Sequence, residues 1–322
     1  MKKKSTIIPL DKWDISHLRQ HLQYAVDLEF WTIPFYMSAM YSIKDRTDPA
    51  YQLIRTVVNQ EMLHLQTAAN IANAYGLSPK LGAPTYKGEI PHIDFSGDSK
   101  SELKKYNPYT AEIGPLDLKH INAMCLIELP ESLSGEAPDL REETTDYGSI
   151  GQFYQALRYG AAQLKNEIRG GVKQVDFFGA FYRNMPSMTI TESGENGFHQ
   201  VDLLIDLITE QGEGEGKNTE TMAETFRNTA DDSFAEDDHF DKFMEIKNGK
   251  SLPTTFKAIA PAKYNAHQKK LEAILIAQFT ELRAVLEGLF AGENPQSFFP
   301  IMASVGGAIR NCWENEVTPK FS

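Results

Sequence analysis

The stretch Asn59-Gln60-Glu61-Met62-Leu63-His64-Leu65, in the middle of residues 50–75, decides the fold. Glu61 and His64 continue a row of apolar residues spaced three or four positions apart, which is the period of one face of a helix. The row consists of Leu53, Val57, Glu61, His64, Ala68, Ile71 and Tyr75. The pattern therefore predicts a helix over residues 50–75 that turns a carboxylate and an imidazole towards the core.

Glu61 and His64 can be explained in two ways. A buried carboxylate is strongly destabilising unless it is paired or binds a cation. Side chains three residues apart project from the same side of a helix, so both can reach one metal ion. The alternative is a structural helix in which Glu61 meets a buried arginine or lysine. Possible partners such as Arg55, Arg158 and Arg169 mostly lie off the apolar rows, which favours the metal.

A second helix with a core-facing glutamate is predicted for residues 15–43, where Asp14 or Ser16 can cap its first turn. Glu29 stands in the middle of its apolar row. That row consists of Leu18, Leu22, Ala25, Glu29, Ile33, Tyr36 and Met40. The polar turn at residues 44–49 is short, so this helix and the helix over residues 50–75 are expected to be antiparallel neighbours.

Two more glutamates occupy similar positions. Glu128 follows the row Leu118, Ile121 and Cys125 on a helix that Asp117 can cap and Pro130 stops. Glu210 lies in line with Leu203 and Leu207 on a helix predicted for residues 197–211. The chain thus places acids on the buried faces of separate predicted helices.

This set of acids predicts an all-α bundle around a metal site. Di-iron and di-manganese bundles take glutamate from two helices and Glu-x-x-His from two others, all projecting inward. Buried carboxylates repel one another strongly, and divalent cations neutralise that repulsion. Carboxylate and imidazole ligands suit iron or manganese. Iron is the expected metal, as one or two ions, and manganese is the alternative.

The second half of the site lacks the expected imidazole on its own helix, because Glu213 and not histidine stands three residues after Glu210. Two histidines are candidates to replace it. His239 belongs to the amphipathic turn His239-Phe240-x-x-Phe243 that follows an acidic segment, and His199 lies on the same helical line as Glu210. A mononuclear site is the alternative to a dinuclear one.

Length and composition limit the functional class. A chain of 322 residues can bury a large core without disulfides, and its net charge of -12 argues against a nucleic-acid surface. Cys125 and Cys312 lie far apart, which excludes a disulfide framework and fits a cytoplasmic location. No apolar run reaches the length of a membrane span, and Lys2-Lys3-Lys4 is not followed by a signal-peptide core.

The remaining segments are expected to be connections and packing helices. Residues 78–115 form a long crossover, a helix runs over residues 150–168, and the aromatic residues 177–182 fill the core in preference to lining a substrate pocket. Helices at residues 265–290 and 295–316 supply packing or an oligomer surface, which leaves a homo-oligomer open. We expect residues 1–260 to form the metal-binding bundle with insertions. Residues 261–322 form a C-terminal hairpin packed on it within the same domain.

Four segments carry a resemblance to a known family. They are residues 23–36 (Gln-Tyr-Ala-Val-Asp-Leu-Glu-Phe-Trp-Thr-Ile-Pro-Phe-Tyr), residues 59–70 (Asn-Gln-Glu-Met-Leu-His-Leu-Gln-Thr-Ala-Ala-Asn), Glu210-Gln-Gly-Glu-Gly and His239-Phe-x-Lys-Phe. In this order they resemble the ferritin-like domain of the iminophenyl-pyruvate dimer synthase family, over most of residues 14–315. Glu29, Glu61 and His64 match the first half of a ferritin-like site, and Glu128 lies in a similar Ile-Glu-Leu-Pro-Glu context.

The resemblance implies a ferritin-like four-helix bundle with a long crossover, extra loops and C-terminal helices. That family works in violacein-type and related indole pigment pathways, so it also implies secondary metabolism and an oxidative reaction on an amino-acid-derived substrate. The synthases are much longer than this chain and carry a region that is absent from it. The dimerisation chemistry is therefore not carried over.

Three functions compete on this evidence. The first is a metal-dependent, O2-using oxidoreductase, an oxidase or oxygenase of an amino acid or its imine, with no nucleic-acid or membrane partner. Its metal ligands and catalytic residues would be Glu29, Glu61, His64, Glu128, Glu210 and His239. The second is iron oxidation and storage without an organic substrate. The third is a non-catalytic helical scaffold.

Residues beside the ligands have two interpretations each. Gln60 and Asn70 are close enough in sequence to steer the imidazoles, although surface positions are favoured for both. Tyr36, two turns beyond Glu29, can relay an electron or proton, and a packed core tyrosine is the favoured alternative.

Overall fold

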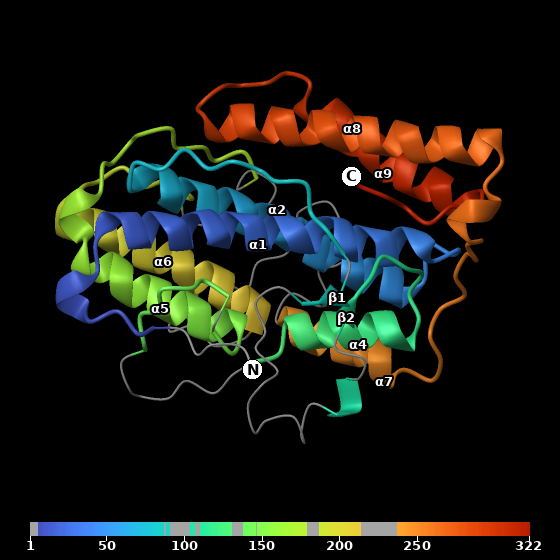
Figure 1. Cartoon of the computed structure of the whole chain (residues 1–322), viewed down its shortest axis with the longest axis horizontal. Coiled ribbons are helices and arrows are strands. Elements are labelled where there is room, and N and C mark those ends of the chain that lie inside the picture. Colours follow the sequence, from blue (N-terminus) through green and yellow to red (C-terminus); the bar gives the residue numbers. More distant parts are fainter. Residues whose placement is uncertain are drawn as a thin grey trace.

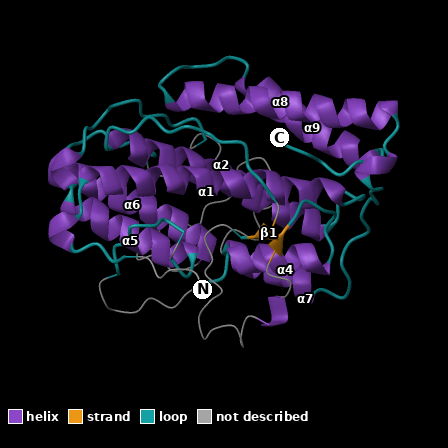
Figure 2. Ribbon diagram, in the orientation of Figure 1, coloured by secondary structure: helices purple, strands orange, loops and turns teal. Residues whose placement is uncertain are grey.

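Two long antiparallel helices form the centre of the molecule, α1 (Ile15–Ser42) and α2 (Pro49–Ala74) (Figure 1). The computed structural model describes residues 6–86, 88–90, 104–106, 110–130, 138–145, 147–178, 187–213 and 237–322, except the side chains of residues 89 and 213. The predicted rows of both helices are buried, with Leu18, Leu22 and Val57 at 0% exposure. The all-α prediction is confirmed (Figure 2).

Two pairs of shorter helices cover one side of α1 and α2. The pair α5 (Ile150–Gln163) and α6 (Gly194–Glu213) packs near one end, and the pair α4 (Leu118–Ile127) and α7 (His239–Asn248) packs near the other (Figure 1). The carboxyl ends of α4 and α6 and the amino end of α7 consequently meet near the middle of the long helices.

The C-terminal hairpin covers the opposite side of α1 and α2. It consists of α8 (Ala266–Phe290) and α9 (Phe298–Glu314), which pack on α2 and α1 respectively (Figure 1). Buried hydrogen bonds attach it: Trp313 Nε1 donates to Ser38 O at 3.0 Å, and Asn73 Nδ2 donates to Phe290 O at 2.8 Å. The hairpin therefore shares its core with the long helices.

Side-chain caps explain where several helices begin. Asp14 accepts hydrogen bonds from the backbone N–H groups of Ser16 and His17, so it is Asp14 and not Ser16 that caps α1. Asp117 and Asp238 cap α4 and α7 in the same way. The capped α7 is longer than the single turn expected for the residues after His239, because Phe243 and Ile246 extend its buried face.

Two connections differ in detail from the sequence prediction. The helix predicted over residues 150–168 ends at Gln163, and a 3-10 helix at Lys165–Glu167 follows it. Arg169 N then donates to Ala74 O at 2.8 Å, which turns the chain onto the end of α2. The long crossover contains a two-stranded antiparallel ribbon, β1 (Gly88–Glu89) with β2 (Thr110–Ala111), and a 3-10 helix at Lys104–Tyr106.

The aromatic cluster fills the core where it is described. Phe177 and Phe178 pack against Phe298, with ring centroids 4.9 and 5.5 Å apart. Residues 179–182 of the predicted cluster lie outside the described residues. In the part of the chain that the structure describes, no helix has the length and apolar character needed to cross a membrane.

Gly160 lets the N-terminal segment pack closely on α5. A Cβ atom there would lie 2.7–2.8 Å from ring atoms of Trp13, which is 5% exposed and donates from Nε1 to Gly160 O. We expect Gly160→Ala to lower the free energy of unfolding by about 1–3 kcal/mol through this overlap. Urea denaturation measures the change.

Gly307→Ala is the matched control. Gly307 is exposed on α9, and a Cβ atom there meets nothing within 4 Å. Alanine favours a helix over glycine by up to about 1 kcal/mol, so this variant should be as stable as the wild type or more stable. Equal destabilisation of both variants would contradict the packing of Trp13 on α5.

Candidate metal centre

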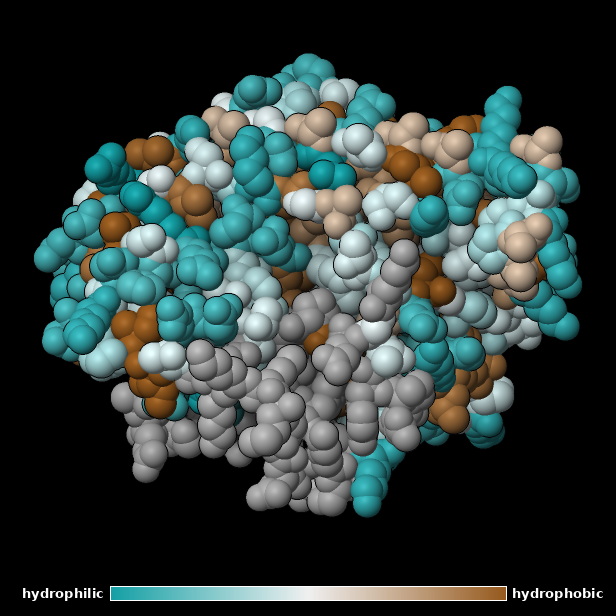
Figure 3. Space-filling view, viewed as in Figure 1, coloured by the Kyte–Doolittle hydropathy of each residue, from teal (hydrophilic) through white to brown (hydrophobic). Residues whose placement is uncertain are grey.

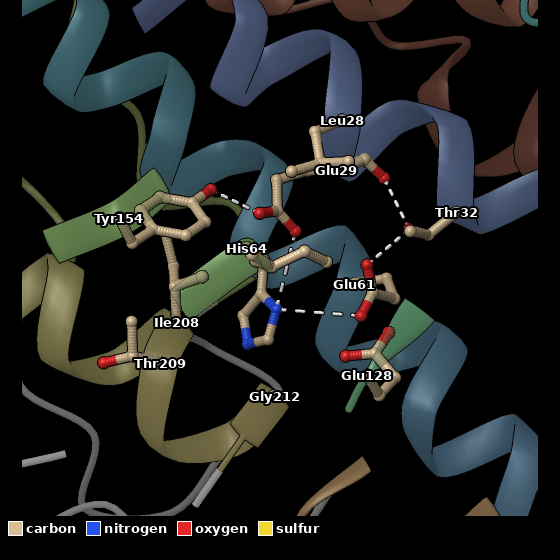
Figure 4. Close-up of a pocket in the computed structure, with 11 residues that line it drawn as sticks. Leu28, Glu29, Thr32, Glu61, His64, Glu128, Tyr154, Ile208, Thr209 and Gly212 are labelled. Carbon is tan, nitrogen blue, oxygen red and sulfur yellow. Dashed lines mark hydrogen bonds and ion pairs between the residues drawn. The ribbon is translucent and has the colours of Figure 1, made fainter. Parts of the chain in front are cut away.

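Five acidic and imidazole side chains from four helices meet in the interior. Glu29 comes from α1, Glu61 and His64 from α2, Glu128 from the C-cap of α4, and His239 from the first turn of α7. All five are buried, with exposures between 0% and 4%. Figure 4 shows Glu29, Glu61, His64 and Glu128 pointing into the same small space. The helix ends described above therefore bring together residues that are far apart in the sequence.

The side chains form two groups that share Glu61. Nδ1 of His64 lies 3.7 Å from Glu29 Oε2 and 3.8 Å from Glu61 Oε1. Nδ1 of His239 lies 3.0 Å from the same Glu61 oxygen and 3.6 Å from Glu128 Oε2. Each group thus offers one imidazole nitrogen and oxygens of two carboxylates. Ligand atoms of Glu61, His64 and His239 lie within 4.8 Å of one another, close enough for a shared ion.

Three hydroxyl groups orient the carboxylates. Thr32 Oγ1 donates to Glu61 Oε2, Tyr36 Oη donates to Glu128 Oε1, and Tyr154 Oη donates to Glu29 Oε1. One oxygen of each glutamate is held by a hydroxyl group, and the other oxygen faces an imidazole. The hydroxyl groups therefore leave one oxygen of each carboxylate directed at the centre.

Two glutamine side chains hold the outer nitrogens of the imidazoles. His64 Nε2 lies 2.9 Å from Gln211 Oε1, and His239 Nε2 lies 3.2 Å from Gln60 Oε1. An amide oxygen can only accept, so each Nε2 donates and a neutral ring keeps its lone pair on Nδ1. Hydrogen bonding of the outer nitrogen to a carbonyl is typical of metal-binding histidines.

Burial and mutual repulsion decide the protonation of the metal-free centre. Burial, reinforced by the charge of Glu61, raises the pKa of Glu29 well above its usual value. Burial also raises the pKa of Glu61, against the effect of His239. It lowers the pKa of His64 well below the usual value. Burial by itself lowers the pKa of His239, but its contacts with Glu128 and Glu61 raise the pKa to about 9.

The residues of the centre fit a divalent metal ion. Of the described residues, no arginine or lysine lies within ion-pair distance of Glu29, Glu61 or Glu128. Arg158, a candidate partner in the scaffold hypothesis, instead contacts Asp202 and Asp206. Nδ1 of His239 is buried near two carboxylates without hydrogen-bond geometry. Carboxylate oxygens and imidazole nitrogens turned towards one another need a cation between them.

A cavity of about 20 Å³ adjoins the centre, enough for roughly one water molecule. Besides the glutamates and His64, its walls include Tyr154, Ile208, Thr209 and Gly212 (Figure 4). A Cβ atom at Gly212 would lie 3.6 Å from Glu128 Oε2, so the missing side chain leaves space beside that carboxylate. The described part of the centre thus has room for a small ligand next to the metal-binding groups.

The structure places the two remaining candidates from the sequence differently. Glu210 is half-buried near the end of α6, and the group of ligand atoms that Glu61, His64 and His239 form among the described residues includes neither Glu210 nor Glu29 nor Glu128. The next residue, Gln211, contacts His64. His199 is exposed near the start of α6, whereas His239 has 0% exposure at the centre. Of the two candidate imidazoles, the structure brings His239 to the glutamates.

Sequence patterns missed several groups around the ligands. The only sequence feature that could have indicated a buried Tyr154 is its position one helical turn after the apolar Ile150. No sequence feature indicated that Thr32 and Gln211 lie beside the proposed ligands. Gln60 was expected at the surface, which is wrong: it is 3% exposed and contacts His239. Asn70 is buried too, but its amide donates to backbone oxygens of Val175 and Met188 and not to an imidazole.

A helical fold with buried Glu and His ligands from several helices defines the class of carboxylate-bridged metal proteins. Residues 22–248 match the sequence profile of the family described as Ferritin-like. The chain is also similar to a ferritin-like protein from Caulobacter vibrioides of known crystal structure. The identity is 43%, over 96% of this chain and 99% of that chain, and the TM-score is 0.83. No curated protein matches. The chain belongs to the Ferritin-like family.

The two candidate histidines can be separated by a pair of variants. His239→Ala should weaken metal binding because it removes an imidazole that lies 3.0 Å from Glu61. His199→Ala, the same change at an exposed position, should leave metal binding unchanged. The metal content of both variants after anaerobic loading with ferrous iron measures the difference. Equal metal content in the two proteins would contradict the role of His239.

Proposed function

We propose that the protein is a non-haem di-iron oxidase or oxygenase that uses O2 to oxidise a small amino-acid-derived molecule, such as an amino acid or its imine. The observation that carries the proposal is the orientation of the buried carboxylates. Each of Glu29, Glu61 and Glu128 has one oxygen held by a hydroxyl group and the other turned towards an imidazole Nδ1. This arrangement suits two ions that share Glu61.

Glu29, Glu61 and His64 would hold one ion, and Glu61, Glu128 and His239 would hold the other. Iron bound there supplies the electrons for reduction of O2. Manganese suits the same donor set and is the alternative metal. The ligands come from helices with their own packed cores, so the protein presents them in a fixed geometry.

The surrounding residues control protons and water. Burial, together with the charge of Glu128, raises the pKa of Tyr36 well above its usual value. Burial and the charge of Glu29 do the same for Tyr154. Both phenols therefore keep their protons, and each holds one oxygen of a proposed ligand carboxylate by a hydrogen bond. Leu28, Ile150 and Ile208 line the cavity and limit the access of water.

The organic substrate is supported by the resemblance to the iminophenyl-pyruvate dimer synthases and by the additional elements of the chain. The chain has three additions to a simple four-helix bundle. They are the long crossover between α2 and α4, the helix α7 and the C-terminal hairpin. One of these additions supplies a proposed ligand, His239. These features favour a pathway enzyme of secondary metabolism over a storage protein.

Iron oxidation without an organic substrate is the second candidate. It is favoured by the volume of the cavity, about 20 Å³, which is too small for an amino acid. In this function iron would be the substrate, and the same carboxylates would bind it before and after oxidation.

Removal of ligands tests the site. We expect about one to two iron equivalents in the wild type after anaerobic loading, from the two groups of ligands. Glu61→Ala and His64→Ala should each lose most of this iron, Glu61→Ala because both groups share its carboxylate. His199→Ala, at an exposed position, should retain it. Iron content is measured by elemental analysis, and full retention in Glu61→Ala and His64→Ala would defeat the assignment.

Oxygen consumption separates the two functions. For the oxidase, the ferrous protein should consume O2 catalytically only when a suitable amino acid is added, and a panel of amino acids is the practical probe. For iron oxidation, O2 use should be stoichiometric with added ferrous iron and end in a ferric mineral. An oxygen electrode and ferric absorbance follow both reactions. Mineral formation that is independent of every amino acid would overturn the oxidase proposal.

A further inference from the structure

Lys242 is a buried lysine one turn after His239 on α7. Its exposure is 0%. Its ammonium group lies 3.4 Å from Gln60 Oε1 and also donates to the backbone oxygen of Asp237. A buried ammonium group is costly, so a position of this kind needs a physical reason.

The contact with Gln60 constrains the hydrogen bonds around His239. An ammonium group can only donate, so the amide atom of Gln60 that faces Lys242 has to be the oxygen. The same oxygen lies 3.2 Å from His239 Nε2. The hydrogen bond between them therefore requires that Nε2 carries the proton. If the amide were reversed, its NH2 group would face the ammonium group and also turn a donor towards His239 Nε2.

The reversed amide would be incompatible with a metal ligand. It would favour the tautomer in which Nε2 accepts and Nδ1 carries the proton. Nδ1 is the nitrogen that lies 3.0 Å from Glu61 and 3.6 Å from Glu128. A neutral histidine binds a metal only through an unprotonated nitrogen, and the partner of the other nitrogen selects the tautomer.

The other imidazole has no equivalent support. His64 Nε2 also contacts a glutamine oxygen, that of Gln211 at 2.9 Å. Among the described residues, however, Gln211 Nε2 has no hydrogen-bond partner. A fixed cation therefore orients the amide beside His239 only, which makes the two halves of the centre different.

We propose that Lys242 is a positioning residue for the metal centre: through the Gln60 oxygen it selects the tautomer of His239 that directs a free Nδ1 at Glu61 and Glu128. The inference rests on the proposed metal site and adds to it a residue that does not touch the metal. Loss of such an outer partner typically weakens metal binding about 10- to 100-fold.

The sign of the effect distinguishes positioning from charge. A lysine that acted only through its positive charge would repel a divalent ion, so its removal would tighten binding. Positioning has the opposite consequence. Metal binding that depends on His239 is the step that is lost in His239→Ala. We therefore expect Lys242→Met to weaken this step by about 10- to 100-fold. Any binding step that remains in His239→Ala should be unchanged in Lys242→Met.

Anaerobic titration of the metal-free protein with Co2+, followed by the visible absorption of the bound ion, measures each step. Imidazole 15N NMR of the Zn2+-loaded protein gives a second readout, because it reports which nitrogen of His239 carries the proton. The expected results, at one limiting Zn2+ concentration, are coordination of His239 through Nδ1 with a proton on Nε2 in the wild type, and a fraction of uncoordinated His239 in Lys242→Met. Lys247→Met is the matched control, because Lys247 lies on the same helix with its ammonium group over the Tyr106 ring.

Each outcome decides between the alternatives. Unchanged or tighter Co2+ binding in Lys242→Met, or full coordination of His239 through Nδ1 at the limiting Zn2+ concentration, would overturn the inference. If Lys242→Met does not fold, as judged by circular dichroism, Gln60→Met decides, because it removes the same amide and should weaken the same step. If the wild type binds neither Co2+ nor iron, the proposed function itself fails, and this result is distinct from failure of the Lys242 inference.

Discussion

The structure depends on the burial of three carboxylates whose basic neighbours, among the described residues, are the imidazoles of His64 and His239. Glu29, Glu61 and Glu128 lie in a helical core where arginine or lysine would ordinarily neutralise them, and within the described residues neither does. In such surroundings repulsion and desolvation both disfavour the charged form, so a cation is needed to keep the carboxylates ionised. Burial and the charge of Glu61 accordingly raise the pKa of Glu29, and the contacts of His239 with Glu128 and Glu61 raise its pKa to about 9.

The arrangement of the helices brings the proposed ligands together. The long helices α1 and α2 provide three of them along their middle turns, while Glu128 and His239 come from helix ends. A ligand at a helix end can be followed immediately by a change of chain direction. For this reason the second side of the molecule is divided between two short pairs, α5 with α6 and α4 with α7, which meet at the centre (Figure 1). Polar side chains dominate the face of the molecule seen in Figure 3, and apolar residues are scattered over it, as expected when the apolar helix faces are buried.

Uncharged hydrogen-bonding groups orient the carboxylates and imidazoles of the proposed site. Threonine and tyrosine hydroxyl groups hold one oxygen of each carboxylate, and glutamine amides hold the outer nitrogen of each imidazole. Because these partners are uncharged, they orient the ligands without competing with a metal ion for them. The ammonium group of Lys242 contacts the amide oxygen of Gln60. In the described part of the chain, the half of the centre that contains His239 therefore has a positive charge beside its outer partner.

The sequence by itself determined the helical class, the long antiparallel pair and the first half of the site. Those features are local: Glu29, Glu61 and His64 interrupt apolar rows of a single period, and such a row has one buried face. Only the tertiary structure decided which imidazole joins them, because His239 follows a long segment with no helical pattern and reaches the centre through the packing of α7. The same holds for Tyr154, Gln211 and Lys242. Their roles arise from hydrogen bonds between residues distant in the sequence, and the periodicity of one helix carries no information about such partners.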